Sequence, residues 1–498
     1  MFGAALGGAL FCLGYVGFGF WPLALVAWAV LWTALDAVPR RSIRGAALAG
    51  FAFGWIAHAG GYAWLWRLVD VFLAGRVAIG AVLWLLHSLW FATGYAAYAV
   101  LVRCLRARGW PLALAGVAPL VVLEWLYPQL FPAHLGDSFV DQTRFVQIAD
   151  LGGPLLVTAL AALANAAVYE TWHWIVDTRR RPHATIAAAA LAIGASAAYG
   201  TMRMGAIERD SAAAPALRVG IVQGNADVLE KRRDPEGLHD LYLAQTQQLL
   251  GGDPLDLVVW PETVYTRGIR GPLPVAGRPV APDLGVPLLF GASSHRVVDG
   301  RLLRFNSAFL IGADGTIRDG YDKNLLVPFA ENLPFRDRLE SIFPQAQDFG
   351  SATDTPPLAL GPYRISTPIC YEAAVPGFVR RMVARARPHL LVMLSNDAWF
   401  GDSQEPWIHL AVARMRAIEH HRFEVRATNS GVSAVIDPAG RVVVRSGLLT
   451  RENLRGSVRL LDGDTLYGRF GAWAGWVAAA ASAGMLLVRA PGRRRHLA

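Results

Sequence analysis

The sequence predicts a multi-pass α-helical membrane bundle of about eight spans joined to an α/β sandwich domain. Of the 498 residues, 54% are hydrophobic and 17% are charged, whereas about 25% are charged in a typical soluble protein. Apolar stretches of about 20 residues follow one another up to residue 200. Short β-branched runs then alternate with amphipathic stretches. This composition excludes a disordered chain, a collagen and a disulfide-stapled secreted module.

The apolar stretches are each long enough to cross a hydrocarbon layer of about 30 Å as a helix. They cover residues 2–19, 21–37, 46–66, 78–101, 111–128, 153–174, 185–200 and 470–488. The first lacks a basic start and is followed by further spans, so we interpret it as a membrane helix rather than a secretory signal. We therefore expect a bundle over 1–205, a separate domain over 216–462, a C-terminal membrane helix over 470–488 and a basic tail over 489–498.

The arginines predict the orientation in the membrane. Short loops rich in basic residues stay in the cytoplasm, and every even-numbered span is followed by an arginine cluster: Arg40, Arg41 and Arg44; Arg103, Arg106 and Arg108; Arg179 to Arg181; Arg493 to Arg495. Both termini are then cytoplasmic, and the domain between spans seven and eight lies outside the cytoplasm. The net charge of +9 fits membrane anchoring and requires no nucleic acid.

The domain between the last two spans has an α/β pattern. Strand-like runs cover residues 217–223, 255–260, 286–291, 307–311, 363–369, 389–394 and 433–436, and helical patterns cover 237–250, 376–386 and 407–420. Three of the apolar runs end in reactive side chains, at Glu262, Cys370 and Asp397. Active groups of α/β folds gather at strand ends, so we expect these three ends to converge.

Cys370 is a candidate nucleophile. Cys12 lies within a predicted span and Cys104 at a cytoplasmic helix end, so neither can pair with Cys370 in an external domain. A free thiol there is prone to oxidation unless its chemistry is used. The alternative is a buried structural cysteine, which is a common fate of free thiols.

Lysine and glutamate complete a possible catalytic group. The chain has two lysines, Lys231 and Lys323, and its other basic side chains are arginines. A compact ammonium can sit beside an oxyanion or a thiolate where a planar guanidinium is too broad, although either lysine could simply be a surface residue. Glu262 follows an apolar run and a Trp-Pro pair, so burial can raise its pKa towards that of a general base. Alternatively, it only bonds nearby backbone.

The motifs around these residues carry a family resemblance. Trp260-Pro261-Glu262, Tyr321-Asp322-Lys323 and Ile369-Cys370-Tyr371-Glu372 resemble, in order, the Glu, Lys and Cys blocks of the carbon–nitrogen hydrolase, or nitrilase, superfamily. Residues 395–402, 413–417 and 428–432 resemble more specifically the apolipoprotein N-acyltransferase family. This resemblance implies a nitrilase-like αββα sandwich held outside the cytoplasm by eight membrane helices.

The resemblance also implies a ping-pong acyl transfer. The acyl donor would be a membrane phospholipid, the intermediate a thioester on Cys370, and the acceptor the α-amino group of the N-terminal diacylglyceryl-cysteine of an apolipoprotein. Glu262 would be the base, and Lys323, with a backbone N–H after the nucleophile, would stabilise the oxyanions. Glu331 would support the base and the amine, and Tyr371 and Glu372 would shape the site beside the sulfur. No metal or soluble cofactor is expected.

Some positions depart from the family pattern. Lys231-Arg232-Arg233-Asp234 stands where Lys-Trp-Asp is common, and Ala330-Glu331-Asn332 where Gly-Glu-Tyr is usual. These changes affect substrate detail rather than the thioester step.

Two alternative functions remain. One is a membrane-tethered carbon–nitrogen hydrolase that uses water as its acceptor, and the other is a non-catalytic lipid-binding scaffold. We interpret three further polar residues as mainly structural: His409 as a polar helix residue, Arg416 as an internal ion-pair partner and Asp397 as a strand-end hydrogen-bond acceptor.

Overall fold

The structure is a computed structural model that describes residues 1–39, 41–68, 73, 75–177, 182–227, 233–282, 284–298, 300–343, 346 and 348–490. Its chain divides into two compact units. The first comprises Met1–Trp66, Ala78–Arg203 and Phe470–Ala498, and the second comprises Arg67–Val77 and Met204–Arg469. Several residues used above lie outside the described part of the chain: Arg40, Arg179 to Arg181, Lys231, Arg232 and Arg493 to Arg495.

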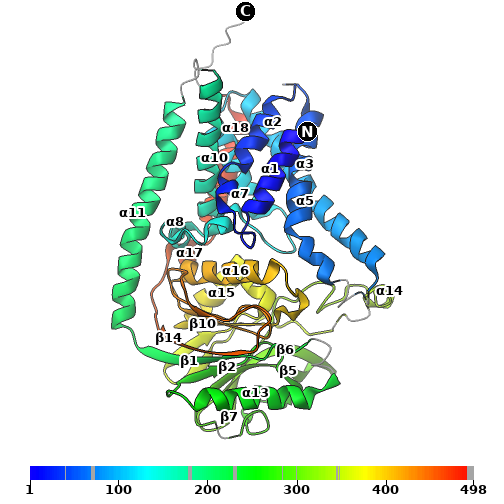
Figure 1. The fold of residues 1–498 in the computed structure, drawn as a ribbon, viewed down its shortest axis with the longest axis vertical. Coiled ribbons are helices and arrows are strands. Elements are labelled where there is room, and N and C mark those ends of the chain that lie inside the picture. Colours follow the sequence, from blue (N-terminus) through cyan, green and yellow to red (C-terminus); the bar gives the residue numbers. More distant parts are fainter. Residues whose placement is uncertain are drawn as a thin grey trace, which may run out of the picture. The chain divides into compact units, whose positions relative to one another are not determined.

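The first unit is built from helices (Figure 1). Its main elements are α1 (Phe2–Gly14), η1 (Trp21–Leu25), α2 (Ala27–Asp36), α3 (Ile43–Gly61), α5 (Val77–Ala107), α6 (Leu112–Ala115), α7 (Val117–Leu126), α10 (Pro154–Val176), the start of α11 (His183–Ala213) and α18 (Trp473–Leu487). Small residues let them pack closely. A side chain at Gly8 of α1 would meet the backbone oxygen of Phe53 in α3 at 2.3 Å.

All eight apolar stretches contain helices, but the helices differ in length. The three that are long and apolar enough to cross a membrane, among the described residues, are α5, α10 and α11. α1 has 13 residues, which is about 20 Å of helix. The second and fifth stretches are interrupted, at the 3₁₀ turn containing Pro22 and between α6 and α7 at Gly116. The number of eight spans therefore stays a prediction.

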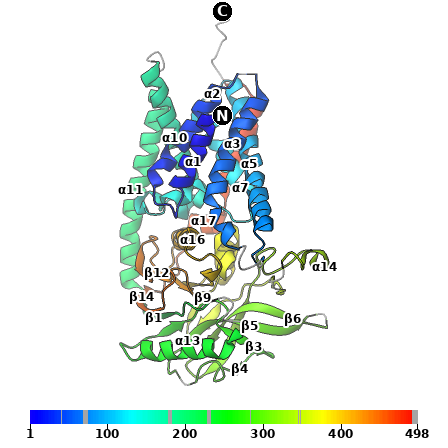
Figure 2. The same ribbon diagram turned by 45° about the vertical axis from the view of Figure 1, so that its right-hand side comes forward.

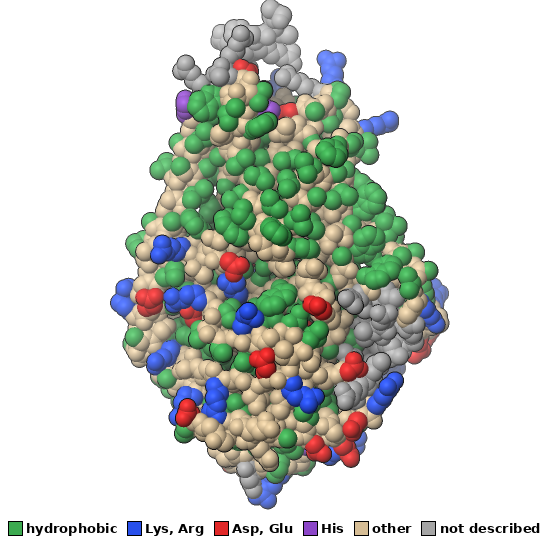
Figure 3. Space-filling model, in the orientation of Figure 1, with side chains coloured by type: hydrophobic (Ala, Val, Ile, Leu, Met, Phe, Trp, Pro, Cys, Tyr) green, Lys and Arg blue, Asp and Glu red, His purple; other side chains and the backbone are tan. Residues whose placement is uncertain are grey.

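The surface of the helical unit is largely apolar (Figure 3). Large hydrophobic side chains such as Leu86, Ile175, Leu191 and Trp476 are more than half exposed there. Lys, Arg, Asp and Glu side chains gather instead over the second unit (Figure 3). Contiguous exposed apolar surface of this extent marks contact with a membrane or a partner rather than with water.

The second unit contains two β-sheets within its described residues (Figure 2). The larger sheet has the strand order β14-β1-β2-β5-β6-β7-β4, with β3 also paired to β5, and the other has the order β13-β12-β11-β10-β9-β8. The larger sheet comprises β1 (Ala216–Gln223), β2 (Leu257–Val259), β3 (Tyr265–Arg270), β4 (Val275–Ala276), β5 (Leu288–Val298), β6 (Arg301–Ile311), β7 (Thr316–Asp322) and β14 (Glu452–Arg459). The smaller comprises β8 (Leu358–Leu360), β9 (Tyr363–Ser366), β10 (Leu390–Ser395), β11 (Glu424–Thr428), β12 (Ala434–Ile436) and β13 (Val442–Arg445).

Alternation along the strands produces four layers. Leu257 and Val259 of β2 face the core between the sheets, where they join Val392 and Leu394 of β10. Val258, the residue between them, faces the opposite side, in the cluster with α13 (Pro235–Leu250). On the far side of the second sheet, Met393 of β10 packs with α16 (Glu405–His420). Figure 1 shows the resulting order, with α13 outside one sheet and α15 (Pro376–Ala386) and α16 outside the other. The predicted α/β sandwich is confirmed.

The predicted strands and helices lie at the expected places, with some differences in length. The run predicted at 307–311 is only the end of β6, which starts at Arg301 and pairs with β5 along its whole length. β7 was not predicted, because its sequence Thr316–Asp322 alternates weakly and contains Gly320. Lys323 follows this strand directly, so β7 positions one of the predicted site residues.

Candidate active site

Glu262 lies in a tight turn directly after β2. Its side chain is buried, and the turn continues through Thr263, which has a positive φ of 49°. The neighbouring strand β5 passes so close that a side chain at Gly291 would meet the Glu262 Cα atom at 2.6 Å. The Gly291 N–H also donates to the Pro261 carbonyl at 3.1 Å. The absence of a side chain at Gly291 thus allows the backbone at Glu262 to pack directly against β5.

Lys323 extends from the end of β7 between two carboxylates. Its Nζ lies 2.8 Å from an oxygen of Glu331 and 3.5 Å from Glu262 Oε1. The lysine side chain is 1% exposed, and its backbone N–H donates to the Asn306 carbonyl at 2.8 Å. Asn306, on β6, donates its side-chain amide to Glu262 at 2.6 Å and to Glu331 at 3.0 Å. One ammonium and one amide thus hold both carboxylates in place.

The two carboxylates fix the charge of the lysine. Burial alone lowers the pKa of Lys323, but Glu331 and Glu262 outweigh it and raise this pKa above its ordinary value. Lys323 therefore stays a cation, and a buried cation can stabilise an anion formed beside it.

Cys370 begins the short helix η4 (Cys370–Ala374) with a positive φ of 51°. This conformation is strained for a side chain other than glycine and is typical of functional sites. Burial and the charge of Glu262 raise the pKa of the thiol, while Lys323 lowers it. The thiol is thus protonated at neutral pH and lies within electrostatic reach of both residues.

Glu372 ties the segment after Lys323 to the segment of Cys370. One of its oxygens accepts from the Tyr321 hydroxyl at 2.7 Å and from the backbone N–H groups of Asn324 and Leu325 at 2.6 and 3.1 Å. The other oxygen accepts from the Ile369 N–H at 2.8 Å. Burial raises the pKa of Glu372 to about 7, although these donors lower it. The neighbouring Tyr371 is half-buried.

Two family models and several known proteins match this chain. The family model described as Carbon-nitrogen hydrolase matches residues 218–460, and the one described as Apolipoprotein N-acyltransferase N-terminal domain matches residues 7–167. An apolipoprotein N-acyltransferase from Azotobacter vinelandii is 33% identical over 94% of this chain and 91% of its own length. One from Pseudomonas aeruginosa is 32% identical over 94% and 92%. This chain belongs to the apolipoprotein N-acyltransferase family.

A solved structure is also similar. A CN-hydrolase superfamily protein from Xanthomonas campestris aligns with a TM-score of 0.37 and 22% identity, covering 57% of this chain and all of that one.

The predicted site residues of this family member come together around Lys323. Glu262 and Glu331 contact its ammonium, and Cys370 interacts electrostatically with it. Glu372 accepts from the backbone N–H groups of Asn324, which follows Lys323, and of Ile369, which precedes Cys370. The departures at Ala330 and Asn332 leave the Glu331 carboxylate in place. The part of the first departure that includes Lys231 and Arg232 lies outside the described residues.

Asp397 belongs to a second buried polar group beside Cys370. It accepts hydrogen bonds from the Ser395 hydroxyl at 2.6 Å and from His409, and it pairs with the buried Arg426. Its predicted role as an acceptor at a strand end is confirmed. Burial raises the pKa of Asp397, but Arg426 and His409 outweigh this effect and lower it below its ordinary value. Arg416 likewise pairs internally with Glu419, as predicted.

Among the described residues, Asp397, Glu405 and His409 come nearest to a metal site, since their ligand atoms lie within 4.8 Å of one another. However, the Arg426 guanidinium already balances the charge of Asp397, and the His409 Nε2 atom faces the Cys370 carbonyl. We therefore interpret this group as a hydrogen-bond network rather than as a cation site.

Two residues of the site were missed by sequence reasoning. Asn306 lies just before the run predicted as a strand, and a polar residue there gives no signal that it faces two carboxylates. His409 was interpreted as a polar helix residue, and its partners become visible only in the fold.

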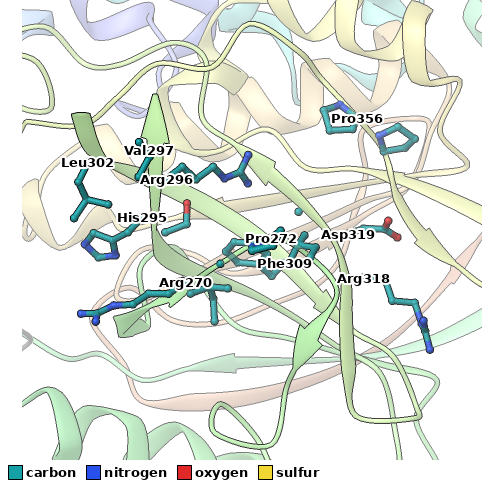
Figure 4. Close-up of a pocket in the computed structure, with 16 residues that line it drawn as sticks. Arg270, Pro272, His295, Arg296, Val297, Leu302, Phe309, Arg318, Asp319 and Pro356 are labelled. Carbon is teal, nitrogen blue, oxygen red and sulfur yellow. The ribbon is translucent and has the colours of Figure 1, made fainter. Parts of the chain in front are cut away.

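A groove of about 920 Å³ lies elsewhere on the second unit, over β3, β5, β6 and β7 (Figure 4). Its walls combine apolar residues such as Phe309 with Arg270, Arg296 and Arg318. Two of these arginines pair with acidic neighbours, Arg296 with Asp322 and Arg318 with Asp314. None of the predicted site residues lines this groove.

Proposed function

We propose that this chain moves a fatty acyl group from a membrane phospholipid to the α-amino group of the diacylglyceryl-cysteine at the N-terminus of an apolipoprotein. The observation that carries the proposal is the group formed by the buried Glu262 and Lys323 with the half-buried Glu331 and Cys370. It lies in a chain similar to apolipoprotein N-acyltransferases over nearly its full length. In this scheme the base, the cation and the nucleophile are all side chains.

The first half-reaction forms a thioester. Glu262 takes the proton of the Cys370 thiol as the sulfur attacks the ester carbonyl of the phospholipid. The Lys323 ammonium stabilises the resulting oxyanion. When this intermediate collapses, a carbon–sulfur bond remains, the carbon–oxygen bond breaks, and Glu262 returns its proton to the departing lysophospholipid.

The second half-reaction passes the acyl chain to nitrogen. The free α-amine attacks the thioester and Glu262 takes a proton from it, so that an amide forms while the carbon–sulfur bond breaks. The proton then returns to the sulfur and restores the thiol. Glu331 keeps Lys323 and Asn306 in position during both steps. Glu372 holds the two backbone segments together, and Tyr371 borders the site beside the sulfur.

We further propose that eight spans anchor the enzyme in the inner membrane, with both termini in the cytoplasm and the catalytic domain, residues 216–462, on the periplasmic side. The bundle would comprise residues 1–205, the last span residues 470–488 and the tail residues 489–498. The arginine clusters support this orientation. A domain in that place has no access to cytosolic ATP or acyl-CoA, so an acyl donor from the bilayer fits the compartment.

The test is to trap the acyl-enzyme. The purified full-length chain is incubated with vesicles whose phospholipid carries an isotope-labelled acyl chain, and mass spectrometry looks for the label on Cys370. Addition of a diacylated lipopeptide should then remove the label and yield a triacylated product. Release of labelled fatty acid alone would support the carbon–nitrogen hydrolase, and the absence of any adduct would support the scaffold.

A pair of cysteine variants makes this test specific. Cys370→Ser should abolish thioester formation and turnover while the protein still inserts into the membrane. Cys104→Ser, the matched control, changes a cysteine of the helical unit and should leave both intact. Turnover retained by Cys370→Ser would remove the nucleophile assignment.

A further inference from the structure

A buried histidine contacts the backbone of the proposed nucleophile. His409 lies in the second turn of α16 and is 5% exposed. Its Nε2 atom is 3.3 Å from the carbonyl oxygen of Cys370, and its Nδ1 atom is 3.1 Å from Asp397 Oδ1. The imidazole therefore connects the end of β10 to the first peptide bond of η4.

The Nε2 atom of His409 is the donor in its contact with Cys370. A carbonyl oxygen can only accept, so Nε2 carries a hydrogen towards Cys370. Asp397 is ionised, because Arg426 and His409 hold its pKa down against the effect of burial. Its carboxylate faces Nδ1 at 3.1 Å and fixes the orientation of the ring. A continuous chain of polar contacts thus leads from Arg426 through Asp397 and His409 to the Cys370 carbonyl.

The geometry of a peptide unit gives this contact a consequence. In a trans peptide, the C=O of one residue and the N–H of the next point in opposite directions across one rigid plane. A donor that holds the Cys370 carbonyl therefore also fixes the direction of the Tyr371 N–H, which points away from His409.

We propose that His409, held by Asp397, is a positioning residue that fixes the Cys370–Tyr371 peptide so that the Tyr371 N–H donates to the oxyanion alongside Lys323. The inference rests on the proposed function, because an oxyanion forms only if Cys370 attacks a carbonyl group. His409 does not touch the acyl donor. It acts through the peptide that it holds.

The experiment compares two reactions of the same sulfur. Acylation of Cys370 by labelled phospholipid passes through an oxyanion, whereas alkylation by iodoacetamide displaces iodide and forms none. His409→Leu removes the contacts to Asp397 and to the Cys370 carbonyl, while His409→Gln keeps an amide that can donate to that carbonyl. His420→Leu is the matched control, because His420 is also buried on α16 and neither of its ring nitrogens makes a hydrogen bond to the described residues.

His409→Leu should slow acylation by about 10-fold to 100-fold, somewhat less than the direct loss of an oxyanion donor, and should leave alkylation within about 2-fold, a change well below 1 kcal/mol. His409→Gln should recover a measurable part of the acylation rate, and His420→Leu should keep the wild-type ratio of the two rates. The inference is overturned if acylation by His409→Leu is unchanged, or if both reactions fall together, since a displaced sulfur would slow both.

A second acyl donor separates this inference from the proposed function. If wild-type protein takes no label from phospholipid, the proposed function fails. The ratio of the acylation rate to the alkylation rate is then measured with a p-nitrophenyl fatty ester as the acyl donor. The carbonyl of this ester also forms an oxyanion when the sulfur attacks. A ratio unaffected by His409→Leu with that ester, or no acylation of the wild type by it, rejects the positioning role.

Discussion

Asn306→Ala tests whether the amide that bridges the two carboxylates supports both stability and acyl transfer. Asn306 is 1% exposed and donates to Glu262 at 2.6 Å and to Glu331 at 3.0 Å. Without it, each carboxylate loses one donor, and room opens for the glutamates to turn away. We expect a less stable second unit and a slower first half-reaction.

The magnitude follows from the number and kind of the bonds. A hydrogen bond to a charged group contributes about 1.5–3 kcal/mol, so the loss of two costs about 3–6 kcal/mol. At about 2–4 °C per kcal/mol for a domain of this size, the melting temperature should fall by about 6–24 °C. If part of the lost energy also stabilised the transition state, its loss slows acylation by about tenfold for every 1.4 kcal/mol.

Thermal unfolding in detergent, followed by tryptophan fluorescence, gives the shift, and label uptake by Cys370 gives the rate. Asn453→Ala is the matched control, because that asparagine donates only to the neutral Gln245 carbonyl, at 2.9 Å, and lies on β14. It should cost less stability and leave acylation unchanged. Equal melting shifts and equal acylation rates for the two variants would refute the reasoning.

Three further predictions follow from the electrostatics of the second unit. Glu262→Gln removes a charge that raises the pKa of Cys370, so alkylation by iodoacetamide at pH 7 should become faster while acyl transfer is lost; slower alkylation would contradict this. Asp397 has a lowered pKa, so the stability it contributes is present at neutral pH and is lost as the pH falls below about 4. Asp397→Asn should therefore cost about 3–5 kcal/mol at pH 7. The urea concentration at the unfolding midpoint should also fall less between pH 7 and pH 3 than in the wild type, and an equal fall would argue against this prediction. Glu372→Gln places an amide N–H opposite a backbone N–H and should lower the free energy of unfolding by about 2–4 kcal/mol. Urea unfolding of the variant and the wild type at pH 7 measures this loss, and an unchanged midpoint would count against the anchoring role of Glu372.

The sequence predicts the part of the site that lies at the ends of apolar runs. Glu262, Cys370 and Asp397 could be found because strand ends place reactive side chains at one edge, and Lys323 because lysine is rare in this chain. Asn306 and His409 could not be found in this way. Each is one polar residue within a regular element, and its meaning depends on what a distant segment places opposite it.

The helical unit shows a similar limit. Hydropathy locates all eight apolar segments, but the length of each helix depends on local breaks. The 3₁₀ turn with Pro22 shortens the second, and Gly116, where a side chain would meet Trp32, divides the fifth. Hydropathy averages over such breaks and therefore overestimates the length of a helix.

The protonated state of Cys370 has a protective consequence. Peroxides and disulfides react with thiolates much faster than with thiols. A sulfur whose proton leaves only when an acyl carbonyl arrives would survive among oxidants between turnovers, without a reductant to restore it. The environment that keeps the thiol of this proposed nucleophile protonated would therefore also slow its oxidation.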